Sequence, residues 1–151
     1  MREPKVTIRY AKSLIGLAIE LNKLEEVHAD MLLLKNLCSD SKELSLFLKS
    51  PIVKSDIKLS LLNQIFSSCV SELTMAFIEL LTKKKREYFL RDISIDFSNL
   101  YNKEKNITPV ILTTAFKIDD ILRNDIMIFL KKQGAENIKL EEKVDESIIG
   151  G

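Results

Sequence analysis

Hydrophobic residues recur every three or four positions through most of the first hundred residues, which is the spacing of amphipathic helices. The first such segment runs from Val6 to Leu21. Its apolar stripe consists of Ala11, Leu14, Ile15, Ala18 and Leu21. A second segment follows from Leu24 to Leu37, and a third runs from Lys42 to Leu48 before Ser50 and Pro51 end it. Three helices are therefore predicted in the first fifty residues.

Three more helices are predicted between Ser55 and residue 105. Ser55 is expected to cap the first, because a serine before an acidic residue and an apolar run is a typical N-cap. Ser71 gives the same signal for the second helix, and the third follows the basic run at 83–86. Their predicted apolar faces are Ile57, Leu61, Ile65 and Phe66; Leu73, Phe77, Leu80 and Leu81; and Phe89, Ile93, Phe97 and Leu100. Six short helices with short connections predict a compact all-α bundle over residues 1–105.

The pattern changes around residues 102–108, which are polar and without periodicity. The apolar and β-branched run that follows, with Pro109 at its start, predicts a strand. Asp119 or Asp120 is expected to cap a helix that ends before Gly134. The apolar face of this helix is Ile121, Leu122, Ile126, Phe129 and Leu130, and the alternating NIKLEEKV at 137–144 follows it as a second strand. Residues 106–151 are thus predicted to form a small α/β domain with β-α-β order.

The last seven residues, DESIIGG at 145–151, predict a third strand that enters a tight turn at Gly150 and Gly151. No sequence follows into which such a turn could return. The two glycines are therefore either a frayed end or the middle of a hairpin whose second strand is missing. About 45 residues is also near the lower limit for an independent core, so this domain is expected to be incomplete.

Composition supports a globular chain and excludes several classes of protein. Hydrophobic residues make up 46% of the 151 residues, and 23 basic against 22 acidic side chains leave a formal charge of +1. This balance gives no overall field for nucleic acid. Charges interrupt the N-terminal segment, and no apolar run is long enough to cross a membrane, so we expect a cytosolic or matrix protein that meets membranes only through a partner. Cys38 and Cys69 are predicted to be reduced core thiols.

The sequence offers no starting point for catalysis or cofactor binding. Four glycines in the whole chain cannot build a phosphate-binding loop. His28 is the only histidine and is expected at the surface or at the boundary of the core, which leaves neither a zinc site nor a catalytic triad. The acidic pairs Asp119/Asp120 and Glu141/Glu142 are explained by a helix cap and a solvated strand face. Catalytic, cofactor-binding and metal-binding residues are thus predicted to be absent, which favours an interaction protein over an enzyme of unfamiliar type.

Two features could serve a partner. The basic run Lys83–Arg86 could contact nucleic acid in a helical RNA-binding or transcription-linked adaptor, although four charges without interleaved aromatic residues are more typical of a solvated turn. The small residues Ala11 and Ala18 in the first helix could let another helix approach closely. Periodicity alone favours simple core packing for these alanines.

The segment RYAKSLIGLAIE at 9–20 resembles the opening of the δ subunit of F-type ATP synthase, the family of the mitochondrial oligomycin-sensitivity-conferring protein. The resemblance extends over the whole chain. It includes the Ser50-Pro51 break, FIELLTKKKREYFLRDI at 77–93, TTAFKIDDI at 113–121 and IKLEEKVDESIIGG at 138–151. It implies a non-catalytic, two-domain stator subunit that links the catalytic head to the peripheral stalk on the cytoplasmic face of a bacterial inner membrane.

The resemblance also implies two partners for a chain that is a monomer in isolation. The bundle would bind the N-terminal helix of an α subunit in a groove between its first and fifth helices, and the C-terminal domain would bind the b-type stalk subunits. Carried onto this sequence, the groove consists of Tyr10, Ala11, Leu14, Ile15, Ala18, Phe77, Leu80 and Leu81, with Lys12 and Glu79 on its rim. Family members continue beyond the IIGG segment, so the resemblance implies that a partner strand is missing after Gly151.

Overall fold

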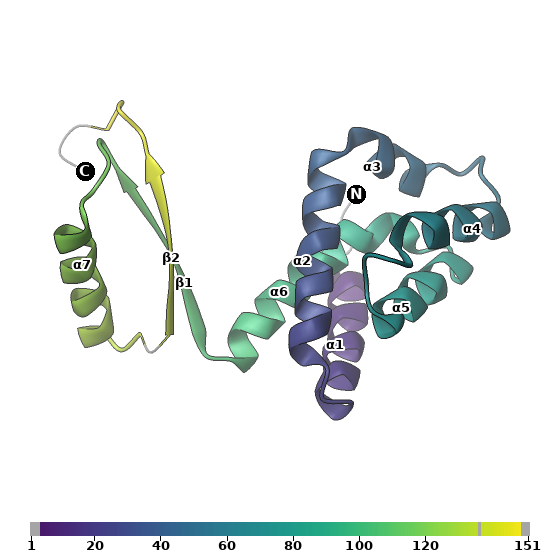
Figure 1. Cartoon of the computed structure of the whole chain (residues 1–151), viewed down its shortest axis with the longest axis horizontal. Helices are drawn as coiled ribbons and strands as arrows, with labels where there is room; N and C mark the ends of the chain where they lie inside the picture. Colours follow the sequence, from purple (N-terminus) through teal and green to yellow (C-terminus); the bar gives the residue numbers. More distant parts are fainter. Residues whose placement is uncertain (1–3, 136, 149–151) are drawn as a thin grey trace. The chain divides into compact units, whose positions relative to one another are not determined.

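The apolar stripes form helices in the computed structural model, which describes residues 4–135 and 137–148 (Figure 1). Contacts divide the chain into two compact units, Met1–Tyr101 and Asn102–Gly151. The sequence predicts the domain boundary after residue 105. The contacts divide the chain between Tyr101 and Asn102, which is inside the last helix of the bundle.

In the described part of the first unit, six α-helices and one short 3₁₀ turn form the bundle (Figure 1). They are α1 (Pro4–Glu20), α2 (Leu24–Asp40), α3 (Lys42–Lys49), α4 (Ser55–Phe66), α5 (Glu72–Lys83), η1 (Glu87–Phe89) and α6 (Leu90–Glu104). The predicted fold class, mainly α with a small α/β unit after the bundle, is confirmed.

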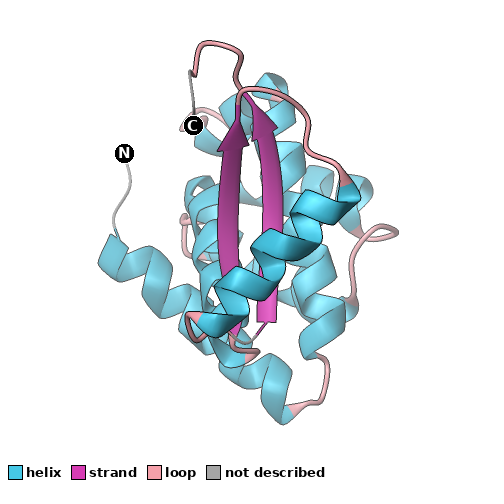
Figure 2. Ribbon diagram, turned by 90° about the vertical axis from the view of Figure 1, so that its left-hand side faces the viewer, coloured by secondary structure: helices cyan, strands magenta, loops and turns pink. Residues whose placement is uncertain are grey.

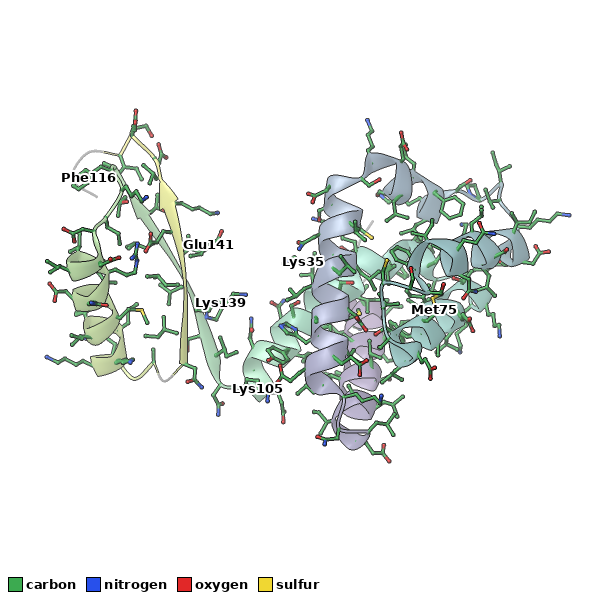
Figure 3. All side chains as sticks on the ribbon, viewed as in Figure 1. Lys35, Met75, Lys105, Phe116, Lys139 and Glu141 are labelled. Carbon is green, nitrogen blue, oxygen red and sulfur yellow. The ribbon has the colours of Figure 1, made fainter. Side chains whose placement is uncertain are left out.

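The core of the bundle consists of one stripe from each long helix. Fully buried side chains from different helices include Ala11, Ala18, Val27, Met31, Leu34, Leu62, Phe66, Leu81, Phe89, Ile93 and Phe97. Met75, labelled in Figure 3, is also buried. Leu21 does not continue the α1 stripe as predicted, because α1 ends at Glu20 and Leu21 is about half exposed.

The predicted helix starts are correct at Ser71 and wrong at Ser55. The Ser71 side chain accepts a hydrogen bond from the Thr74 N–H at 3.3 Å, as an N-cap does. Ser55 is already the first helical residue of α4, and the extended residue before it is Lys54, which makes no side-chain cap. Serine followed by an acidic residue fits the first helical turn as well as the cap. The predicted N-cap, Ser55, therefore lies one residue after the observed N-cap position, Lys54.

The predicted apolar face of α4 is also largely wrong. Ile57, Leu61 and Ile65 are exposed, whereas Lys58 and Leu62 are buried. Of the four predicted positions only Phe66 lies in the core. The buried face of α4 is shifted by one residue from the predicted face, from Ile57 and Leu61 to Lys58 and Leu62. A lysine can lie on this face because it has a buried partner.

That partner is Glu87, which follows α5. The Lys58 ammonium lies 2.7 Å from Glu87 Oε1, and both side chains are more than nine-tenths buried. Lys58 also donates to the backbone carbonyls of Leu48 and Ser50, at 3.3 and 2.9 Å. One lysine therefore ties together the end of α3, the loop that follows it and the segment after α5.

A second buried charge connects α2 to the start of α5. Asp30 Oδ2 accepts hydrogen bonds from the Ser71 N–H, the Ser71 hydroxyl and the Thr74 hydroxyl, at 3.0, 2.6 and 2.7 Å. A carboxylate at a helix N-terminus is also favoured by the positive end of the helix dipole. Asp30 thus fixes where α5 begins relative to α2.

Two other buried hydroxyls, those of Thr82 and Ser94, are satisfied within their own helices. Thr82 donates to the Ile78 carbonyl at 2.8 Å, and Ser94 donates to the Leu90 carbonyl at 2.7 Å. Each of these bonds spans four residues along one helix, so neither joins two helices.

The two cysteines lie in different environments. Cys38 is buried as predicted, but the prediction of a core position for Cys69 is wrong, because Cys69 follows the end of α4 and is exposed. Burial raises the pKa of the Cys38 thiol to about 11, against the opposing charge of Arg91. A raised pKa lowers the thiolate fraction at neutral pH, and the thiolate is the reactive species.

We therefore expect a thiol reagent to label the folded chain in one fast and one slow step at neutral pH. The fast step belongs to Cys69, and Cys69→Ser should remove it while leaving the slow step unchanged. Mass spectrometry of the labelled chain against time checks this. Equal rates for the two thiols in the folded state would contradict the burial of Cys38.

The second unit has the predicted β-α-β order in its described residues. It consists of β1 (Ile107–Thr114), α7 (Asp120–Lys132) and β2 (Asn137–Val144). The strands pair in parallel from Ile107 opposite Asn137 to Thr114 opposite Val144. Both views place α7 along one face of this sheet (Figures 1 and 2). Lys139 and Glu141, labelled in Figure 3, are exposed, whereas Ile138 and Leu140, which alternate with them, are half-buried.

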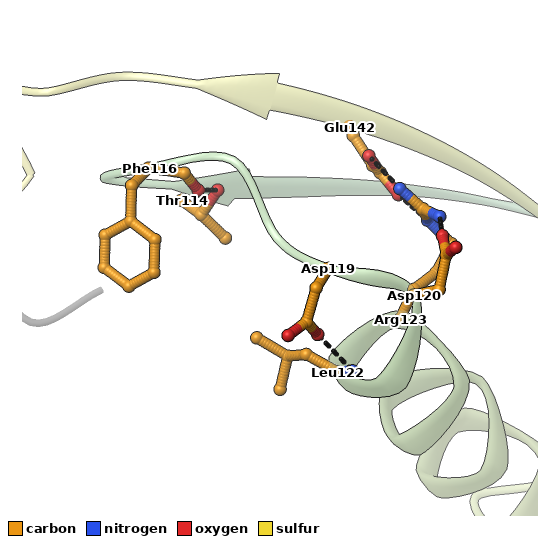
Figure 4. Close-up of polar contacts among 7 residues, drawn as sticks. All are labelled: Thr114, Phe116, Asp119, Asp120, Leu122, Arg123 and Glu142. Carbon is orange, nitrogen blue, oxygen red and sulfur yellow. Dashed lines mark hydrogen bonds and ion pairs between the residues drawn. The ribbon is translucent and has the colours of Figure 1, made fainter.

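Polar contacts define both ends of α7. Asp119 is the N-cap and accepts from the Leu122 N–H at 2.8 Å, as predicted for this position (Figure 4). Arg123 of α7 pairs with Glu142 of β2 and with Asp120 (Figure 4). At the other end Gly134 has φ +98°, the left-handed conformation expected of a glycine after a helix.

Residues 145–148 do not form the predicted third strand. The Ser147 N–H donates to the Asp145 carboxylate at 3.0 Å, and the Ile148 N–H donates to the Asp145 carbonyl at 3.2 Å. These local bonds make a turn directly after β2. The rest of the predicted strand and its glycines, residues 149–151, lie outside the described residues.

Candidate helix-binding groove

Two rows of side chains, one from α1 and one from α5, line an apolar groove on the bundle. The α1 row is Tyr10, Ser13, Leu14 and Leu17, and the α5 row is Leu73, Ala76, Phe77, Leu80 and Lys84. The α1 row and the first four members of the α5 row follow the spacing i, i+3, i+4, i+7, so each forms one continuous helical stripe. The groove has a volume of about 270 Å³.

The floor of the groove is largely buried and its walls are exposed. The rings of Tyr10 and Phe77 meet edge to face across the groove, with centroids 6.3 Å apart. Leu14 and Phe77 are buried, whereas Leu17 and Leu80 are 41% and 43% exposed. Two leucines of this exposure beside an aromatic floor form an apolar surface that water covers in the isolated chain.

The structure divides the eight residues predicted for this site into two sets. Tyr10, Leu14, Phe77 and Leu80 line the groove. Ala11, Ile15, Ala18 and Leu81 are buried in the core beneath it and do not line it. The alanines therefore let α1 approach its neighbours inside the bundle, which is the core reading that periodicity favoured.

The sequence prediction omitted the small residues that do reach the groove. Ser13 and Ala76 are exposed and lie in the middle of the two rows. The spacing already held the signal, because Ser13 is three residues after Tyr10 and Ala76 is three residues after Leu73. Small polar or weakly apolar residues score low in a search for hydrophobic stripes, so this signal was missed.

The charged edge of the groove also differs from the prediction. Neither Lys12 nor Glu79 lines the groove, whereas Lys84 does. The next residue, Lys85, has a left-handed backbone with φ +57° and lines a different hollow. Within the basic run at 83–86, Lys84 therefore borders the α1/α5 groove and Lys85 borders another hollow.

The remaining candidate residues have structural roles. His28 is half-buried, and its ring stacks on that of Tyr101 with centroids 3.5 Å apart. The Tyr101 hydroxyl donates to Glu25 at 2.7 Å, and this bond is the main cause that raises the pKa of Tyr101. No group of three or more metal-binding side chains occurs in the part of the chain that the structure describes. No helix within residues 4–135 or 137–148 has the length and apolar character needed to cross a membrane.

Comparisons with known proteins agree on one family. The family model described as ATP synthase delta (OSCP) subunit matches residues 6–151. ATP synthase subunit delta of Cytophaga hutchinsonii is 37% identical over all 151 residues, which cover 82% of its length. The subunit of Chlorobaculum parvum is 35% identical over 95% of this chain and 79% of its own. Among solved structures, a chain of the Toxoplasma gondii mitochondrial ATP synthase hexamer matches 93% of this chain and 79% of its own, with a TM-score of 0.75 and 28% identity.

Proposed function

The chain belongs to the ATP synthase delta (OSCP) subunit family, and from that premise we propose that it is a non-catalytic stator subunit. Its bundle binds the N-terminal helix of an α subunit in the α1/α5 groove, and its second unit binds b-type subunits of the peripheral stalk. In this role it holds the catalytic head against the torque of the rotor. It works at the cytoplasmic face of a bacterial inner membrane, which it reaches through the complex.

The groove between α1 and α5 is the observation that supports this proposal. An amphipathic guest helix buries anchors at i, i+3, i+4 and i+7, and two host rows of the same spacing accept them between their side chains. Ser13 and Ala76 leave room for the guest backbone in the middle of the groove. Leu17 and Leu80 would lose most of their exposed apolar surface under such a helix, which gives binding its favourable free energy.

Exposed apolar side chains on the second unit support a protein partner there as well. Ile121 of α7 is 74% exposed, and Phe116, just before the helix, is 71% exposed (Figure 4). Phe129 lies two turns further along α7 and is also exposed. Large apolar residues exposed on so small a unit are typical of a surface that another chain covers.

A single substitution in the groove tests the proposal. Ala76→Glu places a carboxylate where the apolar face of the guest must lie, so we expect the affinity for a helix of the α subunit to fall by about tenfold or more. Calorimetric titration with a peptide of the first twenty or so residues of the same organism's α subunit measures this. High salt should change the affinity of the unsubstituted chain little, because apolar burial dominates.

Ala29→Glu on α2 is the matched control. Ala29 is exposed, does not line the groove, and has an acidic residue four positions earlier, as Ala76 does. Ala11→Asp would be a poor test, because Ala11 is fully buried and the change would damage the fold. The proposal fails if the folded chain does not bind the peptide, or if the two Ala→Glu variants lose affinity equally.

A further inference from the structure

A second hollow lies on the bundle around the loop between α3 and α4. It has a volume of about 700 Å³ and is lined by residues 48–56, Lys58, Lys85, Glu87 and Tyr88. We call it the loop hollow. It shares none of its lining residues with the α1/α5 groove.

One of the residues that line the loop hollow, Glu87, carries a buried hydrogen-bond acceptor without a partner in the part of the chain that the structure describes. Glu87 Oε1 accepts from the Lys58 ammonium, but Glu87 Oε2 is buried and has no hydrogen-bond partner within the described residues. Lys58 cannot satisfy it, because its three N–H groups are used by Glu87 Oε1 and by the carbonyls of Leu48 and Ser50. A buried carboxylate oxygen in this state needs a donor from a bound molecule or from water.

The rim of the loop hollow is cationic and partly apolar. Lys49, Lys54 and Lys85 are exposed on it, against one exposed carboxylate, Asp56. Ile52 is 88% exposed at the tip of the loop. Its ligand should therefore combine negative charge, an apolar contact and a donor for the buried oxygen.

A neighbouring hollow of about 510 Å³ extends this surface. It shares Leu48, Lys49 and Tyr88 with the loop hollow and adds Arg91 and Asp92. The two hollows thus adjoin at three lining residues, Leu48, Lys49 and Tyr88. Two adjoining hollows suit an extended chain that passes from one to the other better than a compact ligand.

We propose that the loop hollow binds an extended, acidic segment of a partner protein. A backbone N–H of the segment donates to Glu87 Oε2, its carboxylates pair with Lys49, Lys54 and Lys85, and an aliphatic side chain packs on Ile52. This site is independent of the function proposed above for the α1/α5 groove.

A peptide fits this surface better than single-stranded RNA does. Asp56 and Asp92 lie among the cations and would repel a phosphate backbone with a charge at every step. Tyr88 is the one aromatic side chain that lines the two hollows, whereas RNA-binding grooves stack successive bases on several rings. A peptide can place neutral residues opposite the two aspartates.

The test uses the whole chain and a fluorescent hexapeptide with four glutamates and two leucines, blocked at both ends. We expect saturable binding below about 1 mM that weakens with salt. Lys54→Glu should weaken it on the order of tenfold, because the reversed charge faces the peptide. Lys54 precedes α4, where a carboxylate is favoured, so this variant should fold.

Lys42→Glu is the matched control and should change the affinity less than twofold. Lys42 is exposed at the first position of α3 and lines neither hollow, so it makes the same charge change at another helix start. Equal losses in both variants would mean a general charge effect and would overturn the proposal. Tighter binding of a uridine decamer than of the peptide would also overturn it in favour of RNA.

The role of Glu87 is tested on the peptide rather than on the protein. Methylation of each backbone nitrogen in turn removes one N–H and keeps every charge, and we expect one position to weaken binding by about tenfold. Amide shifts in NMR spectra should move at residues 85–88, at Ser50 and at residues 52–54 when the peptide is added. Unchanged affinity across the methylated series, or shifts confined to α1 and α5, would overturn the assignment.

Discussion

Glu87→Leu is expected to lower the free energy of unfolding by about 3–5 kcal/mol. The substitution leaves the Lys58 ammonium buried next to two backbone carbonyls with no counter-charge. An uncompensated charge in the core costs more than the pair gains, and this asymmetry makes the effect large. Urea unfolding followed by circular dichroism at 222 nm, which reports mainly the bundle, measures it.

The double variant Lys58→Met, Glu87→Leu distinguishes the effect of an unpaired buried charge from the effect of changed packing at position 87. Replacing both charges with apolar side chains of similar size is often close to neutral, so we expect it to regain more than half of the stability that Glu87→Leu loses. Recovery should be incomplete, because the Leu48 and Ser50 carbonyls lose their donor. A double variant as unstable as the single one would show that the loss comes from packing.

Asp30→Ala is expected to cost about 3 kcal/mol of stability. The change leaves three donors at the start of α5, on Ser71 and Thr74, without their acceptor, and it removes a negative charge from a helix N-terminus. Asp40→Ala, at the exposed end of α2, removes the same group where it makes no such contacts and should change stability by less than about 0.5 kcal/mol. Thermal and urea unfolding of the two variants compare them directly, and equal effects would contradict the structural role of Asp30.

The limits of prediction from sequence are clearest in α4. Periodicity found the helix but chose the wrong face, because it counted Ile57, Leu61 and Ile65 as core and Lys58 as solvent. Lysine is almost never buried unless paired, and its partner here is 29 residues away in the sequence. A pattern read within one segment cannot see such a partner. By contrast, Ser71 was predicted as a cap and the α7 cap was narrowed to Asp119 or Asp120, because a cap depends on residues only three positions apart.

The groove shows the same limit on a smaller scale. Its helices were predicted from periodicity, but its aromatic pair was named through the family resemblance, and of the two rings only Phe77 lies on the apolar stripe predicted for its helix. The exposed small residues Ser13 and Ala76 were not, because their role depends on how α1 and α5 are rotated about their axes. That rotation is set by packing against the rest of the bundle. Because successive residues of an α-helix are about 100° apart around its axis, an error of one residue points the helix at a different neighbour.

In the second unit, local signals predicted the elements but not how far they continue. β2 and the start of α7 are where alternation and capping put them, whereas β1 begins at Ile107, two residues before the start predicted at Pro109. The turn at residues 145–148 arises from the Asp145 side chain, which captures the Ser147 N–H. A short polar side chain that bonds its own backbone competes with a strand, and the apolar pair that follows does not reveal it.

The buried hydroxyls of Thr82 and Ser94 differ in kind from the buried charges. The carbonyls they bond, those of Ile78 and Leu90, belong to the same helices and can still accept the ordinary helical N–H bond if the hydroxyl is absent. Such positions can drift between hydroxyl and methyl side chains over evolutionary time at little cost to folding. Asp30 and Lys58 lack this freedom, because each specifies which segments meet. The bundle thus carries two sorts of buried polar residue: those that bond only within their own helix, and those that determine which segments pack together.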